Sequence, residues 1–253
     1  MKVYGFVAIT AAFLSTVLDG YAEAIHPDQP GRIGEPHHRA EAQGFYTSLE
    51  AGWASRYIAE GREAFGDNGL TSFLAILGYR DFSVELWQGL SDGSSAREFQ
   101  ASVYYSIPMD PVSITFGLTH INDTRGGDED LDLSLTLSSE LCSGIFWDTN
   151  FYHGSDRGGS YLESGISHTW ETPYVDINLG AHLGTNFGYV VDGHKGADHF
   201  VLSADFSKEV AEGLTLSAGY SYIFDIDRDP TRHAEDQKLY QGSLFGFAAE
   251  YSF

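Results

Sequence analysis

Ionisable side chains recur at alternate positions of several segments whose remaining positions are apolar. The set comprises Glu50, Arg56, Glu85, Asp148, Glu163, Asp176, His182, Asp205 and Glu250. If the apolar positions contact lipid, this set must point into a polar interior, because charge in hydrocarbon is costly. Seven carboxylates against one arginine would line a lumen that favours cations. The alternative is that these side chains fill and cross-link a narrow barrel whose interior is plugged.

A second acidic group lies shortly before the C-terminal segment. Its members, spaced like the ligands of a calcium-binding loop, are Asp225, Asp227, Asp229 and Asp236. Pro230 stands where such a loop needs glycine, however, and Asp236 replaces the usual bidentate glutamate. We therefore interpret these carboxylates as part of a solvated external rim. The same interpretation covers another acidic group, Asp123, Asp128, Glu129 and Asp130.

Histidines give two further hypotheses of metal binding. His194 and His199 are close in sequence to Asp192 and Asp198, and this combination could hold a transition metal. Three more histidines fall in a polar N-terminal segment, at His26, His37 and His38. Polar loops and tails commonly collect such residues without forming a site. We therefore predict no metal site and no other cofactor.

The sequence does not select a set of catalytic residues. Serine and histidine are frequent, as in Ser167-His168, but a nucleophile needs a base and an orienting group in contact with it. No H-E-x-x-H metal motif is present. The single cysteine, Cys142, excludes an intramolecular disulfide and is interpreted as a small buried or turn residue. A membrane-barrel hydrolase is thus a weaker alternative to a protein that is not an enzyme.

The elements that would position these residues have a hydrophobic period of two, which indicates β-strands rather than helices. Leu131, Leu133, Leu135 and Leu137, for example, alternate with polar residues. Most such segments have about the 9–11 residues that a tilted strand needs to cross a membrane. Twelve strands are predicted, near 44–58, 70–78, 82–90, 98–107, 112–121, 131–140, 144–152, 160–171, 175–185, 199–208, 214–224 and 240–253.

The connections between these segments alternate in length. Those after the even-numbered segments are short, at 79–81, 108–111, 141–143, 172–174 and 209–213. Those after the odd-numbered segments are mostly longer and more polar, at 59–69, 91–97, 122–130, 153–159, 186–198 and 225–239. Outer-membrane barrels have short turns at the periplasmic end and longer loops outside. The pattern therefore predicts such a barrel, with both ends of its strand sequence on the periplasmic side.

Composition agrees with this fold and excludes one class of partner. The chain has 36 acidic against 14 basic residues, so a role in binding nucleic acid is not expected. Its 29 glycines, 15 tyrosines and 17 phenylalanines suit strands and tight turns. Aromatic residues also stand near many predicted strand ends, where girdles of this kind mark the two lipid–water interfaces.

The N-terminal region predicts export. Lys2, an uncharged apolar stretch and the Ala22-Glu23-Ala24 cleavage pattern indicate a signal peptide over residues 1–24. Residues 25–43 are interpreted as a mobile periplasmic tail. Residues 44–253 would form the barrel in the outer membrane of a Gram-negative-type bacterium.

A family resemblance appears at the first predicted strand. The stretch Glu50-Ala51-Gly52-Trp53-Ala54-Ser55-Arg56-Tyr57-Ile58-Ala59-Glu60-Gly61-Arg62 resembles the opening of the TorF-type porins. The match consists of Ser55, Tyr57 and Gly61, whereas Glu60 stands where that family more often has arginine. The resemblance implies a signal-bearing outer-membrane barrel with porin function, and it implies no particular substrate.

The C-terminus indicates a partner for assembly. The chain ends Ala249-Glu250-Tyr251-Ser252-Phe253, which resembles the terminal strand recognised by the bacterial barrel-assembly machinery. The expected partners are therefore outer-membrane lipid and this machinery, and a homo-oligomer is left open.

Together these patterns predict an all-β protein with one up-and-down antiparallel transmembrane β-barrel of about 12 strands, following a cleaved signal peptide. The predicted function is porin-like passage of small polar solutes, with a preference for cations. The main alternative is a plugged barrel with a structural or ligand-docking role. A soluble exported β-sandwich carrier is the remaining alternative, because apolar strand faces could also pack between two sheets.

Overall fold

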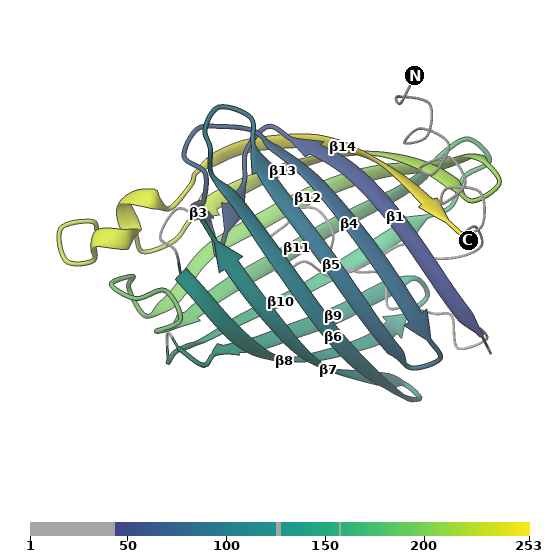
Figure 1. Cartoon of the computed structure of the whole chain (residues 1–253), viewed down its shortest axis with the longest axis horizontal. Coiled ribbons are helices and arrows are strands. Elements are labelled where there is room, and N and C mark those ends of the chain that lie inside the picture. Colours follow the sequence, from purple (N-terminus) through teal and green to yellow (C-terminus); the bar gives the residue numbers. More distant parts are fainter. Residues whose placement is uncertain (1–43, 125–127, 157) are drawn as a thin grey trace, which may run out of the picture.

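The computed structural model describes residues 44–124, 128–156 and 158–253. These residues form one closed antiparallel barrel of twelve strands (Figure 1). The barrel strands are β1 Phe45–Ala54, β4 Leu70–Tyr79, β5 Phe82–Ser91, β6 Arg97–Met109, β7 Val112–Asp123, β8 Asp128–Cys142, β9 Ile145–Gly154, β10 Ser160–Trp170, β11 Asp176–Phe187, β12 Gly196–Ala211, β13 Leu214–Asp225 and β14 Gly242–Ser252. Two short strands, β2 Ile58–Ala59 and β3 Arg62–Glu63, pair only with each other. A short 3-10 helix, η1 Ala234–Lys238, precedes β14.

Each barrel strand pairs with its neighbour in sequence, and β1 closes the ring by pairing with both β4 and β14. The up-and-down barrel predicted from the sequence is therefore confirmed. The alternative of a β-sandwich is wrong, because the described barrel strands belong to one closed sheet. The predicted signal peptide and periplasmic tail lie outside the described residues.

The first predicted strand, 44–58, is too long. β1 ends at Ala54, and the chain then turns away from the wall after a backbone hydrogen bond of 2.8 Å from Ser55 to the Phe245 carbonyl. The following segment forms the β2–β3 hairpin before the chain rejoins the wall at Leu70. The prediction failed here because a strand that leaves a barrel wall can keep its alternating pattern.

Burial alternates along the strands as a membrane barrel requires. Large apolar side chains such as Leu133 and Phe247 are 55% and 61% exposed on the outer surface. Residues of opposite parity, such as Ser48 and Asn150, are buried inside. An exposed apolar belt of this extent is stable only in contact with lipid. No helix in the described part of the chain is long and apolar enough to cross a membrane.

The tight turns lie at the end of the barrel that also carries both strand termini. Ser143 and Gly144 join β8 to β9, and both have positive φ angles of 24° and 79°. Positive φ at both central residues gives a turn whose twist matches the flanking strands. The antiparallel pairing of Ser48 with Ser252 puts the start of β1 and the end of β14 at this same end.

A matched pair of arginine substitutions tests the orientation. Ala218 and Ser217 are neighbours in β13, and both have small side chains. Ala218 is exposed on the outside and pairs with Phe206 and Phe247, whereas Ser217 lines an interior cavity. We expect Ala218→Arg to lower the free energy of unfolding by about 2–4 kcal/mol, because its charge would enter hydrocarbon near mid-strand.

Ser217→Arg should cost clearly less, since its charge would face water and carboxylates. Urea titration of the folded barrel in lipid vesicles measures both variants. Equal costs, or a larger cost at Ser217, would contradict the assigned faces.

Candidate functional site

The β2–β3 hairpin lies inside the barrel, near the end that carries the long loops (Figure 1). Glu60 and Gly61 form its turn with φ angles of 45° and 72°. Glycine is needed at position 61 for two reasons. Its φ angle is positive, and a Cβ atom at this position would lie 2.6 Å from Nδ1 of His199. The hairpin is thus fitted against the barrel wall rather than exposed outside.

One side of the hairpin packs on β4 and β5. Tyr57 and Phe65 bury their rings against a cluster that includes Leu70, Leu74 and Trp87. The Tyr57 and Phe65 rings meet edge to face, with centroids 4.8 Å apart. These wall residues are apolar and face inward, so the hairpin supplies the apolar surface that they need.

The ends of the hairpin contact opposite walls. The Tyr57 hydroxyl donates a hydrogen bond of 3.0 Å to Glu98 on β6. Arg62 donates one of 2.6 Å to Asp198 on β12. In the ring order, β6 and β12 are separated by five strands in either direction. The hairpin therefore spans the lumen and narrows it.

Arg62 is the central charge of this contact. Its guanidinium is buried, and it pairs with Asp198 at 2.6 Å and with Asp236 of η1 at 3.3 Å. It also donates to the Glu60 carbonyl at 2.8 Å. Two buried carboxylates need such a partner, because uncompensated charge is expensive away from water. Arg62 consequently ties the hairpin to the wall and to the last external loop.

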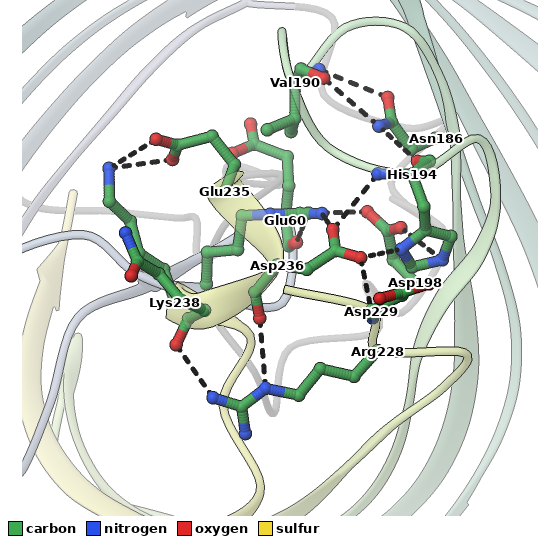
Figure 2. A network of polar contacts seen from close by, with 12 residues as sticks. Glu60, Asn186, Val190, His194, Asp198, Arg228, Asp229, Glu235, Asp236 and Lys238 are labelled. Atoms are coloured by element: carbon green, nitrogen blue, oxygen red, sulfur yellow. Dashed lines mark hydrogen bonds and ion pairs between the residues drawn. The ribbon is translucent and has the colours of Figure 1, made fainter. Parts of the chain in front are cut away.

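His194 joins the same network from the loop between β11 and β12 (Figure 2). Its Nδ1 lies 2.9 Å from Asp236, and its Nε2 lies 3.0 Å from the Ala197 carbonyl and 3.2 Å from Asp198. Both ring nitrogens thus face acceptors, which suits the doubly protonated imidazolium. Burial lowers the pKa of His194, but these acceptors outweigh it and raise the pKa above its ordinary value.

Asp236 is shifted in the opposite direction. Burial raises its pKa, but backbone hydrogen bonds from His194 and Asp229, together with the His194 side chain, outweigh this and lower it below the ordinary value. Figure 2 shows its carboxylate between η1 and the loop that carries His194. The contacts of the loops therefore favour a protonated His194 paired with an ionised Asp236.

A cavity is lined by residues of β1, β4, β12, β13 and β14 together with residues 56–58. Two predicted lumen residues, Glu50 and Asp205, contribute carboxylates to it. Arg56 also lines it, but from the loop after β1 rather than from a strand. Its guanidinium is paired with Glu63 at 2.8 Å and lies over the Tyr240 ring. The expectation that Arg56 belongs to the strand wall is thus corrected.

The other predicted lumen residues all lie on strands. Glu85 and Glu250 are buried on β5 and β14, and Asp176 is half-buried near the start of β11. Asp148 is on β9, and its Oδ1 has no hydrogen-bond partner within the described part of the chain.

Glu163, His182 and His199 form a group of potential metal ligands on the adjacent strands β10, β11 and β12. The sequence placed Glu163 and His182 in the lumen, but it grouped His199, at the start of the predicted strand 199–208, with His194 of the preceding loop. The structure separates these two histidines, since His194 joins the Arg62 network instead.

Several interior carboxylates were missed. Glu98 and Asp132 are 7% and 5% exposed, and Asp132 accepts a hydrogen bond of 2.6 Å from Tyr189. Asp130 was predicted to be solvated but is 2% exposed, and it accepts from the backbone of Leu131 and Asp156. Their alternation with Phe99, Leu131 and Leu133 was the available signal.

The resemblance to a calcium loop gains no support from the contacts of its residues. Asp236 is engaged by Arg62 and His194, as described above. Asp229 bonds to Thr231 at 2.6 Å, and Asp225 pairs with Arg228 at 3.6 Å. Asp227 has an exposed side chain. These carboxylates thus serve contacts within and between the loops.

A short sequence motif lies at the end of β5 and in the loop that follows it. Gly89-Leu90-Ser91-Asp92-Gly93 matches the G-x-S-x-G pattern of a nucleophile elbow. That elbow requires a turn from a strand into a helix, whereas Ser91 ends β5 and is followed by a loop to β6. Its hydroxyl accepts a hydrogen bond from Ser94 at 2.9 Å. The motif therefore lacks its structural context here.

Comparison with known proteins shows the fold. No family model and no curated protein sequence matches the chain. Among solved structures, the KdgM porin matches with a TM-score of 0.57 at 10% identity, covering 81% of this chain and 99% of that one. The NanC porin matches with a TM-score of 0.55 at 10% identity, covering 82% of this chain and all of that one. A KdgM structure in complex with disordered oligogalacturonate aligns similarly, with a TM-score of 0.57.

Both neighbours are porins, and the feature that they share with this chain is the barrel. With the apolar outer belt, they confirm at the level of the fold the predicted location in a Gram-negative outer membrane, where the belt contacts lipid.

Removing the central charge should release the hairpin. In Arg62→Met, Asp198 and Asp236 would lose a buried partner. If nothing else in the structure relaxed, the free energy of unfolding would fall by about 3–5 kcal/mol. We expect the hairpin to leave the wall instead, so that a glutamate-specific protease cleaves at Glu60 or Glu63 while the barrel stays folded.

Arg56→Met is the matched control, because its ion pair with Glu63 is about 29% exposed on both sides. A pair of this kind contributes roughly 0–1 kcal/mol. Equal resistance of both variants to cleavage would show that Arg62 does not hold the hairpin.

The loop network should also depend on pH. Because the pKa of His194 is raised in the docked loop, this residue stabilises docking fully at pH values below its unfolded-state pKa, near 6.5. That stabilisation is lost as the pH rises through the raised pKa of the docked state. Because the pKa of Asp236 is lowered, this residue stabilises docking at pH values above its unfolded-state pKa of 3.8, and the stabilisation is lost as the pH falls through the lowered pKa. Docking should therefore be tightest between these two values.

Hydrogen-exchange protection factors for residues 190–198 measure this effect. We expect higher protection at about pH 6 than at about pH 8, with the difference abolished in His194→Asn. The nearby His233, whose ring centroid is 6.3 Å from that of His194, provides the control variant His233→Asn. Protection that rises from pH 6 to pH 8 would contradict the assigned charge of His194.

Proposed function

We propose that this protein is a porin-like outer-membrane channel that passes small polar solutes and favours cations. The observation that carries the proposal is the cavity in which two carboxylates, Glu50 and Asp205, lie among serines, glycines and apolar side chains. The basic residue that reaches it, Arg56, is already paired with Glu63. The fixed charge facing the cavity is therefore negative.

The remaining interior extends this field. Inward carboxylates are distributed around the ring on β5, β6, β8, β9, β10 and β14, as Glu85, Glu98, Asp132, Asp148, Glu163 and Glu250. Fixed negative charge along a low-dielectric wall concentrates cations and repels anions. Selectivity should depend most on the carboxylates that line the cavity, because these face the path of a solute.

This chemistry differs from that of one structural neighbour. KdgM was solved in complex with an oligogalacturonate, a sugar chain with many carboxylates. The acidic cavity of the present barrel would repel such a polyanion. We therefore assign small cations or neutral polar molecules to this channel and not the ligand of that neighbour.

A second function has its own supporting observation. The β2–β3 hairpin spans the lumen from Glu98 to Asp198 and buries apolar side chains on the wall. A hairpin fixed in this position would make the barrel a plugged structure that docks ligands or serves a structural role. The channel proposal requires either a path beside the hairpin or its transient release.

The finer family assignment and the assembly partner are proposals of the same kind. Membership of the TorF-type porins is supported by Ser55, Tyr57 and Gly61, which all contribute to the position of the hairpin. Recognition of β14 by the barrel-assembly machinery is supported by its aromatic end, Tyr251 and Phe253. Formation of a homo-oligomer stays a prediction.

Selectivity in planar lipid bilayers tests the channel. With a KCl gradient, the reversal potential should show cation preference, and this preference should fade at high salt as charge is screened. The double variant Glu50→Gln with Asp205→Asn should lower the cation-to-anion permeability ratio toward that of free solution. The matched control is Asp67→Asn with Asp227→Asn, which neutralises two exposed loop carboxylates.

The outcomes separate the two functions. Anion preference in the unmodified protein, or equal effects of the two double variants, would refute the cavity as the selective path. The plugged barrel would instead be established if the unmodified protein showed no conductance and the replacement of residues 57–64 by a short Gly-Ser linker produced conductance.

A further inference from the structure

Glu163, His182 and His199 bring three potential metal ligands together on the inner wall. One ligand atom from each side chain lies within 4.8 Å of the other two. Glu163 Oε1 and His199 Nε2 are 3.8 Å apart. Two imidazoles and one carboxylate form a donor set used by zinc and related divalent metals.

The strand register explains how these side chains meet. Gly184 of β11 pairs with Glu163 on one side and with His199 on the other, so the two ligands flank a glycine in one row. A Cβ atom at Gly184 would collide with the His199 ring and the Tyr161 hydroxyl. His182 lies two positions along the same inward face. The missing side chain of Gly184 thus leaves space between the ligands.

His199 is oriented by two residues behind it. The Tyr161 hydroxyl donates a hydrogen bond to Asp198 at 3.3 Å, so it can accept one from Nδ1 of His199, which is 3.2 Å away. Nδ1 would then carry the proton, and the lone pair of Nε2 would face Glu163. A metal-binding histidine usually has its second ring nitrogen fixed by such a hydrogen bond.

His182 supplies the second, independent observation. Its Nδ1 is buried and has no hydrogen-bond partner within the described part of the chain. Its ring stands nearly perpendicular to that of His199, at 87°, with centroids 5.8 Å apart. A buried polar atom without a partner is costly. A metal ion bound through this nitrogen would satisfy it.

Binding of a metal would require the three side chains to move closer together. With metal–ligand distances of about 2.1 Å, tetrahedral ligands stand about 3.4 Å apart. Because the ligand atoms lie within 4.8 Å of one another, the side chains must close by at most about 1.4 Å, which rotation about their own bonds can supply. Three protein ligands leave a fourth position for water or a solute.

We propose that Glu163, His182 and His199 bind a divalent transition metal of the Zn²⁺ class on the inner wall of the barrel. This site goes beyond the proposed channel function and does not depend on it. It also differs from the grouping of His194 with His199 suggested by the sequence, and it contradicts the expectation of no metal site.

The test uses the folded barrel in detergent, titrated with Co²⁺ and then with Zn²⁺. His26, His37 and His38 are replaced by asparagine in all samples, so that the N-terminal segment cannot bind the metal. We expect one equivalent of Co²⁺ with the visible absorption of a tetrahedral site, displaced by Zn²⁺.

Single ligand variants should remove this site. His182→Asn and His199→Asn should each abolish the tetrahedral spectrum, and Glu163→Gln should weaken Zn²⁺ binding. Tyr161→Phe tests the positioning role and should lower affinity by about 10–100-fold with the spectrum retained. The control is His120→Asn, because His120 is exposed on the outer surface of β7.

Heat-modifiable migration on a gel verifies that each variant is folded. Absence of stoichiometric binding would overturn the proposal and leave the three residues as a packed polar cluster. Binding that survives both His182→Asn and His199→Asn would overturn it as well, by placing the metal elsewhere on the protein.

Discussion

The pairing of β1 with β14 is the constraint on which the rest of this structure depends. In hydrocarbon, a backbone group without a hydrogen bond costs several kcal/mol, so a sheet can span a membrane only when it is closed. The register from Ser48–Ser252 to Ala54–Gly246 provides that closure. Closure fixes two surfaces, and because strand side chains alternate, every strand must divide its residues between lipid and interior.

The interior of a closed ring of this size must then be filled with side chains, loops or water. Here the β2–β3 hairpin fills part of it with apolar rings, and the wall matches them with Leu70, Leu74 and Trp87. A second apolar cluster joins Ile58 of the hairpin to Val201, Ile223 and Leu244 of the wall. Among the interior carboxylates, Asp198 is paired with Arg62, whereas Glu50 and Asp205 line a cavity. The hairpin thus combines apolar contacts with the wall and a position beside an acidic cavity.

The barrel could be predicted from the sequence because alternation and loop length are local signals. Both follow from the lipid outside, which acts on every strand in the same way. The hairpin could not be located in this way, because its position depends on contacts across the ring, such as Tyr57 with Glu98. One signal was present: β4 is apolar on both faces, with Phe73 and Leu77 outward and Leu74 and Ile76 inward.

The same distinction explains the candidate sites. Alternation predicts an inward face for carboxylates such as Glu85 and Glu250, which are buried, yet Asp130 and Asp198 were missed because β8 and β12 begin before the predicted strands 131–140 and 199–208. His194 and His199 are close in sequence but belong to different clusters. Which side chains meet depends on the pairing register between adjacent strands, and this register cannot be read from the sequence alone.

The contacts of the hairpin explain the short motif that resembles the opening of the TorF-type porins. The Ser55 hydroxyl accepts a hydrogen bond of 3.2 Å from the Phe245 backbone where the chain leaves the wall. Tyr57 then fills the apolar cluster, and Gly61 turns the hairpin where His199 leaves no room for a side chain. Each residue therefore serves the inward path of the hairpin rather than contact with a solute. Glu60, which departs from the family pattern, adds one more carboxylate to this acidic interior, so the hairpin itself contributes to the charge that a permeant would meet.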